Sequence, residues 1–416
     1  MPKNDSVVRP EEVRCSGAAH LLFGRTSMLV RCCLCFGCSI ALVNDSLNLF
    51  TAPVSEALGV GIGDFSLILT IVNLVSGVMA LVVPHLLDRL PLRMVMAGGV
   101  VLASVSYVAL VFVPNIMWFY LGAVAIGISG CCFSTIPVTY VLQSWYGAKN
   151  GFAVGIAMAC SGMIGAIFSP IIGWLIESIG YQFTLGVLAA AFVVIALPSA
   201  LTVRFGPETL YEHAESDATD VEVFSERMPT VLYLLLMVCV ACFSLLVALS
   251  GHLSIIGLDL GFDLASASLL VSSSLVASVF LKVLVGFLAD RIGSIQAVAL
   301  SCLCSVTGVA ILAVAGASLP LAMAGAFLLG GSAACHTVGL TLITQYVADQ
   351  DFKRVFSHVT VAACLLYAIF VWLLGVLRDV FGGYGFGIAL TFAVGCAALM
   401  LCFVLAHARK ATLRAA

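Results

Sequence analysis

Apolar runs of about 20 residues recur along the whole chain, separated by short segments that contain glycine, proline or charged residues. A helix of this length is long enough to cross the hydrocarbon core of a lipid bilayer. The pattern predicts twelve membrane-spanning helices, at residues 28–52, 65–87, 92–113, 116–143, 151–175, 182–203, 230–251, 264–288, 295–316, 320–344, 355–377 and 384–406.

The longest polar stretch, residues 204–229, falls between the sixth and seventh predicted helices and is rich in Asp and Glu. We expect it to be a solvated linker. The polar residues that precede the first helix do not have the pattern of a secretory signal peptide. The chain is therefore predicted to consist of an N-terminal tail at 1–27, a six-helix bundle at 28–203, the acidic linker at 204–229, a second six-helix bundle at 230–406 and a C-terminal tail at 407–416.

The two predicted bundles repeat a short charged motif at the same place. Asp88-Arg89 follows the second predicted helix, and Asp290-Arg291 follows the eighth. Parallel repeats of this kind are typical of transporters that bind their substrate between the two halves, near the middle of the membrane. The sequence therefore predicts an all-α polytopic membrane protein with two pseudo-symmetric six-helix bundles.

Composition agrees with this fold class and excludes several others. The chain is 62% hydrophobic and only 9% charged, with a mean hydropathy of +1.17, whereas soluble domains are about 25% charged. The net charge of −3 gives no indication of nucleic-acid binding. The 16 cysteines form no paired C-x-x-C sets in polar loops, so we expect thiols that fill helix contacts, with no metal or other cofactor. The sequence contains neither a phosphate-binding loop nor a pattern of paired catalytic residues, so we expect neither an enzyme nor a primary pump.

The distribution of Lys and Arg predicts how the chain is oriented. These residues gather in the tails, in the linker and in the loops that follow even-numbered helices, while the loops at 51–64 and 251–263 contain none. Short loops rich in Lys and Arg stay on the cytoplasmic side. We therefore expect both termini and the linker to be cytoplasmic, in a monomer embedded in the bilayer of the cell (inner or plasma) membrane. Arg378 is an exception, which we place in the loop after the eleventh helix.

One lysine lies inside an apolar run. Lys282 is eight residues before Asp290, which places it about 12 Å inside the hydrocarbon core. Asp45, in the first helix, lies about 9 Å farther from the same side. Ionisable groups at such depths are costly and usually functional. We predict that Lys282 binds an anionic substrate and that Asp45 carries a coupled proton. The two touch only if the helices tilt or the side chains reach toward each other.

Other polar residues within the predicted helices are weaker candidates. Asn48, Asn73, Tyr140 and Tyr367 are candidates for hydrogen bonds to substrate, although bonding between helices is the commoner fate of such residues. His336 is a candidate proton relay, with a helix-contact histidine as the alternative. His252 and His358 are expected to be solvated near the membrane surfaces.

The second charged motif resembles a known family signature. The pattern Gly286-x-x-x-Asp290-Arg291-x-Gly293 is similar to the loop between helices two and three of the major facilitator superfamily, and the first copy is degenerate, with Pro84 in place of glycine. The resemblance implies that this loop gates the cytoplasmic side. The gating residues implied in the two copies are Asp88, Arg89, Asp290 and Arg291.

Within that superfamily the chain resembles the branch of monocarboxylate transporters and oxalate–formate antiporters. The similar stretches include residues 145–156, with their Trp-Tyr and glycine pattern, and Gly382-Gly383-Tyr384. Lys282 falls where this branch has a substrate-binding arginine. The resemblance implies a secondary transporter of a small organic anion, with monocarboxylates as the favoured substrates, moved with a proton or in exchange for a counter-anion.

The sequence also departs from that branch. Asp45 stands roughly where monocarboxylate transporters have a lysine, and Ser278 stands where they have an aspartate. The eleventh helix lacks the second cation of the oxalate-type antiporters, which disfavours a dicarboxylate.

Two other interpretations remain open. In the first, the protein exports amphipathic compounds or carries amino acids, with Asp45 binding an amine. In the second, it is a non-transporting sensor on a carrier fold, although the tails at 1–27 and 407–416 are short for an output domain.

Overall fold

The computed structural model describes residues 10–112, 115–147, 150–206, 230–333 and 349–415. All regular elements in these ranges are helices. Helices satisfy every backbone hydrogen bond within one segment, which is what a chain crossing lipid requires. The prediction of an all-α polytopic protein is confirmed.

The first half of the chain forms one group of helices, several of which are divided by short irregular or π-helical breaks. Its elements are α1 Pro10–Gly37, the π-helix η1 Cys38–Asp45, α2 Leu47–Leu58, α3 Ile62–Arg89, α4 Leu92–Val111, α5 Ile116–Cys132, α6 Thr135–Tyr146, α7 Asn150–Ile179, α8 Tyr181–Ala191, the π-helix η3 Phe192–Ala196 and α9 Leu197–Thr202.

The second half forms another group. Its elements are α11 Thr230–Ser250, α12 Leu253–Asp259, α13 Leu264–Ile292, α14 Ser294–Val314, α15 Leu319–Leu329, α17 Asp349–Phe381 and α18 Gly385–Ala415.

Within the described residues, ten helical segments are long and apolar enough to cross a membrane. An eleventh is formed by Met237–Ser250 and Leu253–Asp259, which are bent by 56° at their junction. The predicted helix at 320–344 is represented by α15, and the rest of it lies outside the described residues.

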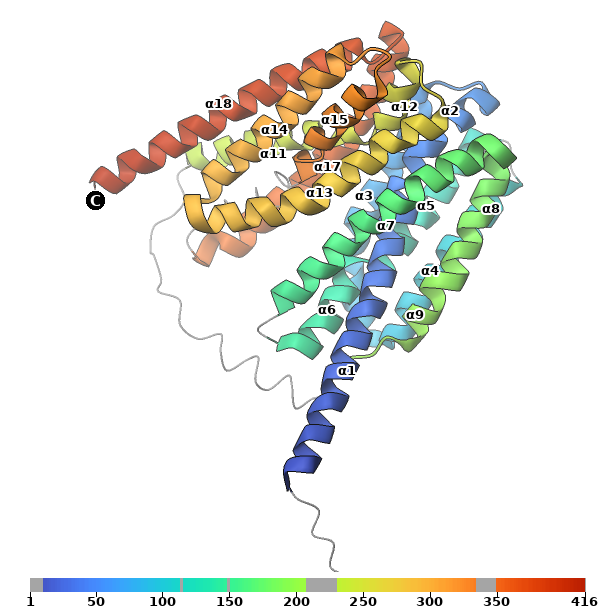
Figure 1. The fold of residues 1–416 in the computed structure, drawn as a ribbon, viewed down its shortest axis with the longest axis vertical. Coiled ribbons are helices and arrows are strands. Elements are labelled where there is room, and N and C mark those ends of the chain that lie inside the picture. The colour runs from blue at the N-terminus through green and yellow to red at the C-terminus, as the bar shows by residue number, and fades with distance from the viewer. Residues whose placement is uncertain (1–9, 113–114, 148–149, 207–229, 334–348, 416) are drawn as a thin grey trace, which may run out of the picture.

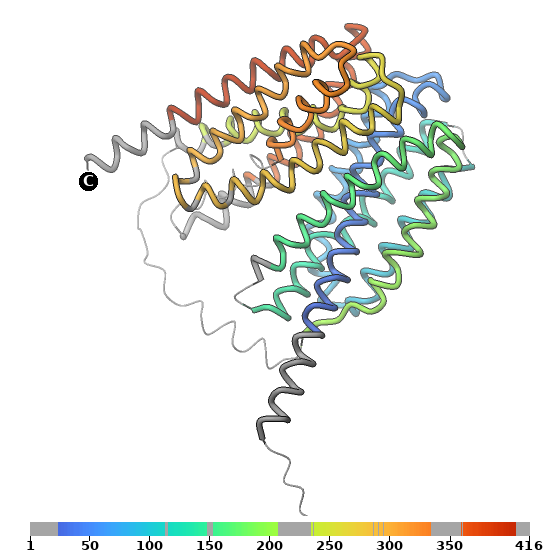
Figure 2. Tube along the Cα trace, viewed as in Figure 1, coloured from blue at the N-terminus to red at the C-terminus, as the bar shows by residue number. Residues whose placement is uncertain are grey.

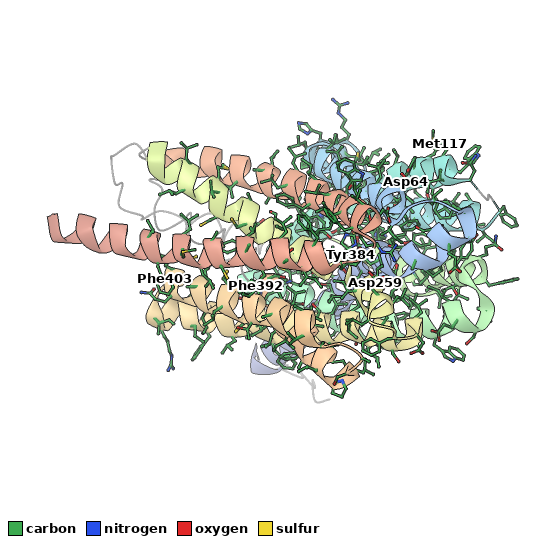
Figure 3. All side chains as sticks on the ribbon, turned by 90° about the horizontal axis from the view of Figure 1, so that it is seen from above. Asp64, Met117, Asp259, Tyr384, Phe392 and Phe403 are labelled. Atoms are coloured by element: carbon green, nitrogen blue, oxygen red, sulfur yellow. The ribbon has the colours of Figure 1, made fainter. Side chains whose placement is uncertain are left out.

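The two groups meet at one end of the molecule and diverge toward the other (Figures 1 and 2). α1 begins and α18 ends at the divergent end, which we call the terminal end. We call the opposite end, which carries the turns after α2 and α12, the closed end. Seen from above, Asp259 and Tyr384 lie where the two groups meet, and Asp64 lies on the N-terminal group (Figure 3).

Glycines allow the helices of the two groups to approach closely at the closed end. A Cβ atom on Gly63 of α3 would lie 3.1 Å from the Cα atom of Val376 in α17. A Cβ atom on Gly375 would lie 3.1 Å from the Cα atom of Gly63. Small residues of this kind are the usual means by which membrane helices bring their backbones into contact.

Hydrogen bonds also join the two groups on the terminal side of this contact. The Thr70 hydroxyl of α3 donates to the Ala368 carbonyl of α17 at 2.7 Å. The Ser272 hydroxyl of α13 donates to the Ala166 carbonyl of α7 at 2.5 Å. The groups are therefore joined along two helix pairs, α3–α17 and α7–α13.

One predicted boundary is wrong. α17 continues to Phe381, so Arg378 lies in the last turn of the helix and not in the following loop. The Arg378 guanidinium donates to the Asp259 carboxylate at 2.9 Å. The ion pair with Asp259 compensates the charge of Arg378, so the helix can continue past it. Hydropathy alone does not reveal such a partner.

Candidate functional site

A cavity of about 170 Å³ lies between the two groups of helices, on the terminal side of their closest contacts. Both groups line it: η1, α2 and α7 from the first, and α11, α13, α17 and the residues that follow α15 from the second. Its charged and polar lining includes Asp45, Asn48, Ser250, Ser278, Lys282 and Tyr367.

A π-helix positions Asp45. The Ser46 N–H donates to the Ala41 carbonyl at 3.0 Å, across five residues, and closes a wide turn. The Leu42 carbonyl accepts the Ser46 hydroxyl at 2.5 Å and the Tyr107 hydroxyl at 2.8 Å. These bonds hold η1 at the point where the first span changes register. Single π-helical turns in α-helices are frequently found at functional sites.

In the described part of the chain, one oxygen of the Asp45 carboxylate is left without a partner. Its Oδ2 atom is buried and has no hydrogen-bond partner among the described residues. A Cβ atom on Gly165 of α7 would lie 3.1 Å from this oxygen, so the absence of a side chain at Gly165 leaves room for it. An unpartnered buried carboxylate oxygen is costly, which makes it a candidate for binding a proton or a ligand.

Lys282 of α13 lines the same cavity and is largely buried. Its charge and that of Asp45 attract each other, yet no contact of 4.0 Å or less joins their charged atoms in the described part of the chain. The structure therefore places the two predicted charges around one space without closing an ion pair between them.

Asn48 and Tyr367 also line the cavity. A Cβ atom on Gly251 would lie 3.7 Å from the Tyr367 hydroxyl and 3.8 Å from the Asn48 amide nitrogen, so both polar groups approach the same backbone position. The Asn48 carbonyl accepts the Ser254 hydroxyl at 3.0 Å from the other group. Asn48 thus contributes to the cavity and to the contact between groups.

Two other candidates, Asn73 and Tyr140, are not brought to the cavity. The Asn73 amide donates to the Leu69 carbonyl of its own helix at 2.8 Å. Tyr140 is 41% exposed on α6. Neither residue lines the cavity. His336 lies outside the described residues.

The residues predicted to form a gate lie at the terminal end. Asp88 and Arg89 are exposed at the end of α3. The Arg291 guanidinium lies over the Phe287 ring, 4.4 Å from its centroid. Asp290 belongs to α13, and its side chain lies outside the described part of the structure. Within the described residues no ion pair links these positions, so their gating role stays a prediction.

Serines form a part of the cavity that we did not predict. Ser161, Ser274 and Ser332 line it together with the serines already named. The Ser332 hydroxyl is buried without a partner among the described residues. Ser274, Ser278 and Lys282 are spaced four residues apart, which places them on one face of α13. That spacing is a signal present in the sequence.

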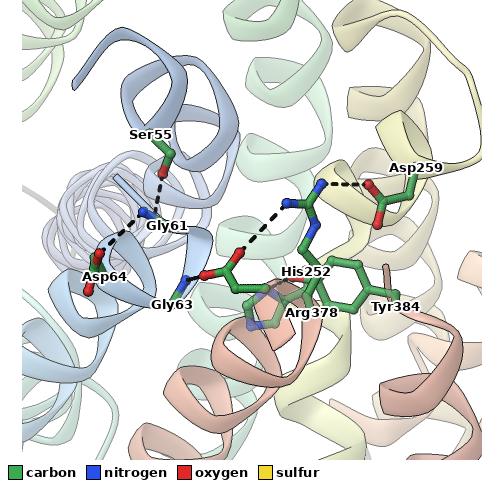
Figure 4. Close-up of polar contacts among 9 residues, drawn as sticks. Ser55, Gly61, Gly63, Asp64, His252, Asp259, Arg378 and Tyr384 are labelled. Carbon is green, nitrogen blue, oxygen red and sulfur yellow. Dashed lines mark hydrogen bonds and ion pairs between the residues drawn. The ribbon is translucent and has the colours of Figure 1, made fainter. Parts of the chain in front are cut away.

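The prediction for His252 is wrong. Its side chain is fully buried at the bend between α11 and α12. One ring nitrogen bonds to the Val371 carbonyl at 2.9 Å, and the other to the Tyr384 hydroxyl at 2.5 Å. His252 therefore ties α17 and the turn before α18 to the bend, next to the Arg378–Asp259 pair (Figure 4).

Comparisons with known proteins agree with this architecture. The family model described as "Major Facilitator Superfamily" matches residues 34–252 and 232–415. A relative named monocarboxylate transporter 13, from Rattus norvegicus, is 25% identical over 71% of this chain and 68% of its own length. A relative named uncharacterized MFS-type transporter YcxA, from Bacillus subtilis, is 25% identical over 37% of this chain. MFS-type transporter 1 from an Ophiocordyceps species is 28% identical over 55% of this chain. The matches to these last two span 38% and 49% of their lengths.

Solved transporter structures share the fold. A mutant of the nucleoside transporter NupG aligns with a TM-score of 0.71 at 12% identity, covering 92% of this chain and 99% of that one. The xylose transporter XylE of E. coli, in a partially occluded inward-open conformation, aligns with a TM-score of 0.70 at 11% identity, covering 91% and 98%. With a family model that matches both halves and a fold shared over nearly its whole length, the chain belongs to the major facilitator superfamily.

Proposed function

We propose that the protein is a secondary active transporter of a small organic anion, with a monocarboxylate as the substrate class, coupled to a proton. The observation that carries the proposal is that Lys282 and Asp45 line one small cavity between the two helix groups without being paired. Membership of a transporter superfamily supports the general activity, and the similarity to a monocarboxylate transporter supports the substrate class.

The size of the cavity favours a small substrate. Sites for drug-sized ligands have volumes of about 300–1,000 Å³, whereas this cavity has about 170 Å³. Apolar side chains, including Ile40, Val247 and Val271, form part of the lining. A short acid with a small apolar part fits this surface better than a bulky amphipathic compound.

The chemistry of Lys282 suits a carboxylate. Its ammonium group offers three hydrogen-bond donors, and its attraction to an anion is much stronger in a cavity of low dielectric than in water. The Tyr367 hydroxyl lines the same space and supplies a further donor. The Ser278 hydroxyl also lines it but donates to the Leu275 carbonyl at 2.8 Å. A carboxylate bound there replaces Asp45 as the counter-charge of Lys282.

Charge balance then provides the coupling. The empty site holds Asp45 as an anion and Lys282 as a cation, with no net charge. The loaded site holds protonated Asp45, cationic Lys282 and an anionic substrate, again with no net charge. A site with only the proton or only the substrate carries an unbalanced charge, which is costly to move through the membrane interior. Proton and anion therefore move together.

Uptake into proteoliposomes tests the proposal. Lys282→Ala should reduce uptake of lactate, pyruvate and formate about tenfold or more, which corresponds to about 1.4 kcal/mol of lost binding. Asp45→Asn should abolish accumulation driven by a pH gradient while leaving exchange of anion for anion. Asn73→Ala is the matched control, because Asn73 is a polar residue of a spanning helix that does not line the cavity.

The experiment also separates the rival interpretations. Unchanged uptake of all three acids by Lys282→Ala would contradict an anion site. Uptake of an amine or amino acid that is lost in Asp45→Asn, with no uptake of simple acids by the parent protein, would assign the site to a cationic group instead.

A further inference from the structure

Two carboxylates at the closed end cross from one helix group to the other, and each accepts a backbone N–H at the start of a helix. The Asp379 carboxylate of α17 accepts the Gly63 N–H of α3 at 2.7 Å. The Glu177 carboxylate of α7 accepts the Ala265 N–H of α13 at 2.9 Å. The N–H groups in the first turn of a helix have no acceptor within that helix, and an anion there also interacts favourably with the helix dipole.

The two contacts are related by the internal repeat. α3 and α13 are the second membrane spans of their groups, and each has the Asp-Arg motif in its last turn. α7 and α17 are the fifth spans, and each carries its carboxylate two residues before its end. Gly63 and Ala265 are each the second residue of their helix. Each group therefore caps the corresponding helix of the other.

Close packing accompanies both contacts. Next to the Asp379 contact, Gly63 and Gly375 bring the backbones of α3 and α17 together. Next to the Glu177 contact, a Cβ atom on Gly173 would lie 3.2 Å from the Leu264 carbonyl oxygen at the start of α13. Each cap can form only while its helix pair is this close, so both are lost when the groups separate.

The two caps are supported differently. Arg378 lies between two acids, 2.9 Å from Asp259 and 3.7 Å from Asp379 (Figure 4). It compensates the charge of Asp379 and holds it beside α3. In the described part of the chain no cation pairs with Glu177. The cap on α3 is therefore reinforced by a cation, whereas the cap on α13 depends on the Glu177 carboxylate alone.

We propose that Asp379 and Glu177 form a reciprocal latch that holds the closed end shut and must release before the central cavity can open toward that end. Arg378 is a positioning residue for the Asp379 half of the latch. Separation of the groups admits water, which replaces both the lost donors and the lost acceptors. The latch thus biases the two arrangements of the transporter without making the closed one irreversible. The proposal does not depend on which substrate the cavity binds.

Hydrogen–deuterium exchange of the full chain in lipid nanodiscs tests the latch. In Asp379→Ala and Glu177→Ala, amides in residues 61–66 and 264–268 should exchange about fivefold faster or more, as expected from the loss of one helix cap. Because release lets the groups close at the opposite end, amides in residues 141–146 and 286–292 should exchange more slowly. The double variant should show a larger shift than either single variant.

Asp64→Ala is the matched control. The Asp64 carboxylate lies at the same end of α3, but it accepts the Gly61 N–H at 3.2 Å within its own group. This variant should alter exchange near Gly61 and leave α13 and the terminal end unchanged. Arg378→Ala loosens the Asp379 half of the latch, so it should accelerate exchange in residues 61–66 and 264–268, by less than Asp379→Ala does.

A steric variant tests the same conclusion without removing a charge. Gly63→Ala places a methyl group against Val376 and should push the closed end apart, whereas Gly77→Ala, in the same helix, meets nothing within 4 Å. Faster exchange at the closed end without slower exchange at the terminal end would show that the carboxylates are merely local helix caps. Exchange at the parent rate in both Asp379→Ala and Glu177→Ala would also overturn the latch. If Asp379→Ala does not fold, Glu177→Ala and Gly63→Ala decide the question.

Discussion

Ser278 lies one helical turn before Lys282, and both side chains line the cavity. Asp at position 278 would put a carboxylate on the same helix face as the ammonium group, where residues four apart are neighbours. This internal counter-charge would compete with the substrate. We expect Ser278→Asp to raise the KM for a monocarboxylate about tenfold, equivalent to about 1.4 kcal/mol, as measured by initial rates of uptake.

Two further variants make this result specific. Ser278→Ala removes the hydroxyl without adding a charge and should change KM much less. The double variant Asp45→Asn with Ser278→Asp restores one acid beside one cation, so it should recover pH-driven uptake that Asp45→Asn alone lacks. A parent-like KM in Ser278→Asp would mean that Lys282 does not hold the substrate carboxylate.

The cost of burying a polar group explains which site residues sequence reasoning found. Asp45, Asn48, Lys282 and Tyr367 interrupt apolar runs, and all four line the cavity. The cavity serines escaped notice because small hydroxyl residues are also common in ordinary helix contacts. Asn73 has the same sequence signal as Asn48, yet its amide is satisfied by its own helix. Sequence alone does not separate these two fates.

At the level of helices, the approach of α7 to η1 sets the space around Asp45. A methyl group at position 165 would lie 2.8 Å from the Leu275 side chain and 3.1 Å from Asp45 Oδ2. Gly165→Ala should therefore force a shift in this contact and lower the uptake rate about tenfold, equivalent to about 1.4 kcal/mol. Gly155→Ala, in the same helix with nothing within 4 Å, should transport normally. Equal uptake by the two variants would contradict this view of the α7 contact.

The hydrogen bond from Tyr107 to the π-helix η1 leads to a prediction about stability. Tyr107→Phe removes the buried hydroxyl that donates to the Leu42 carbonyl. We expect a loss of about 1 kcal/mol in the free energy of unfolding, seen as a lower midpoint in thermal unfolding. Tyr120→Phe is the control, since the Tyr120 hydroxyl bonds to the Asp64 carbonyl in exposed surroundings. If Tyr120→Phe destabilises as much as Tyr107→Phe, the buried bond has no special role in holding η1.

Helix positions were predictable because lipid imposes both the length and the apolar character of each span. The breaks within the spans were not. The π-helix before Ser46 depends on bonds from Tyr107, which is distant in sequence. The bend at His252 depends on Val371 of α17 and on Tyr384 in the turn before α18, both far along the sequence. Hydropathy contains no information on such tertiary bonds, which is why Arg378 and His252 were placed incorrectly.

For the transporter as a whole, the balanced charges of the site predict an electroneutral cycle. One proton accompanies one monovalent anion, so no net charge crosses the membrane. Uptake should be driven by a proton gradient directed inward, with the outside more acidic. It should not respond to a membrane potential set with valinomycin and potassium. A strong dependence of the initial rate on the potential would contradict the proposed charge balance among Asp45, Lys282 and the substrate.

The duplicated architecture was predictable from the repeated Asp-Arg motif and the central polar stretch. Which end of the molecule is closed was not predictable. Two arrangements of one transporter differ by only a few kcal/mol, and hydropathy is the same in both. The contacts that favour the observed arrangement, such as Asp379 with Gly63 and Glu177 with Ala265, join residues from opposite halves of the sequence.

The small volume of the cavity also concerns water. At about 30 Å³ for each molecule in the liquid, a space of about 170 Å³ has room for about six waters. A substrate that fills it must expel them into the surrounding solution. Osmolytes that are too large to enter should therefore tighten substrate binding, and a plot of log Kd against osmolality should have a slope that counts the displaced molecules.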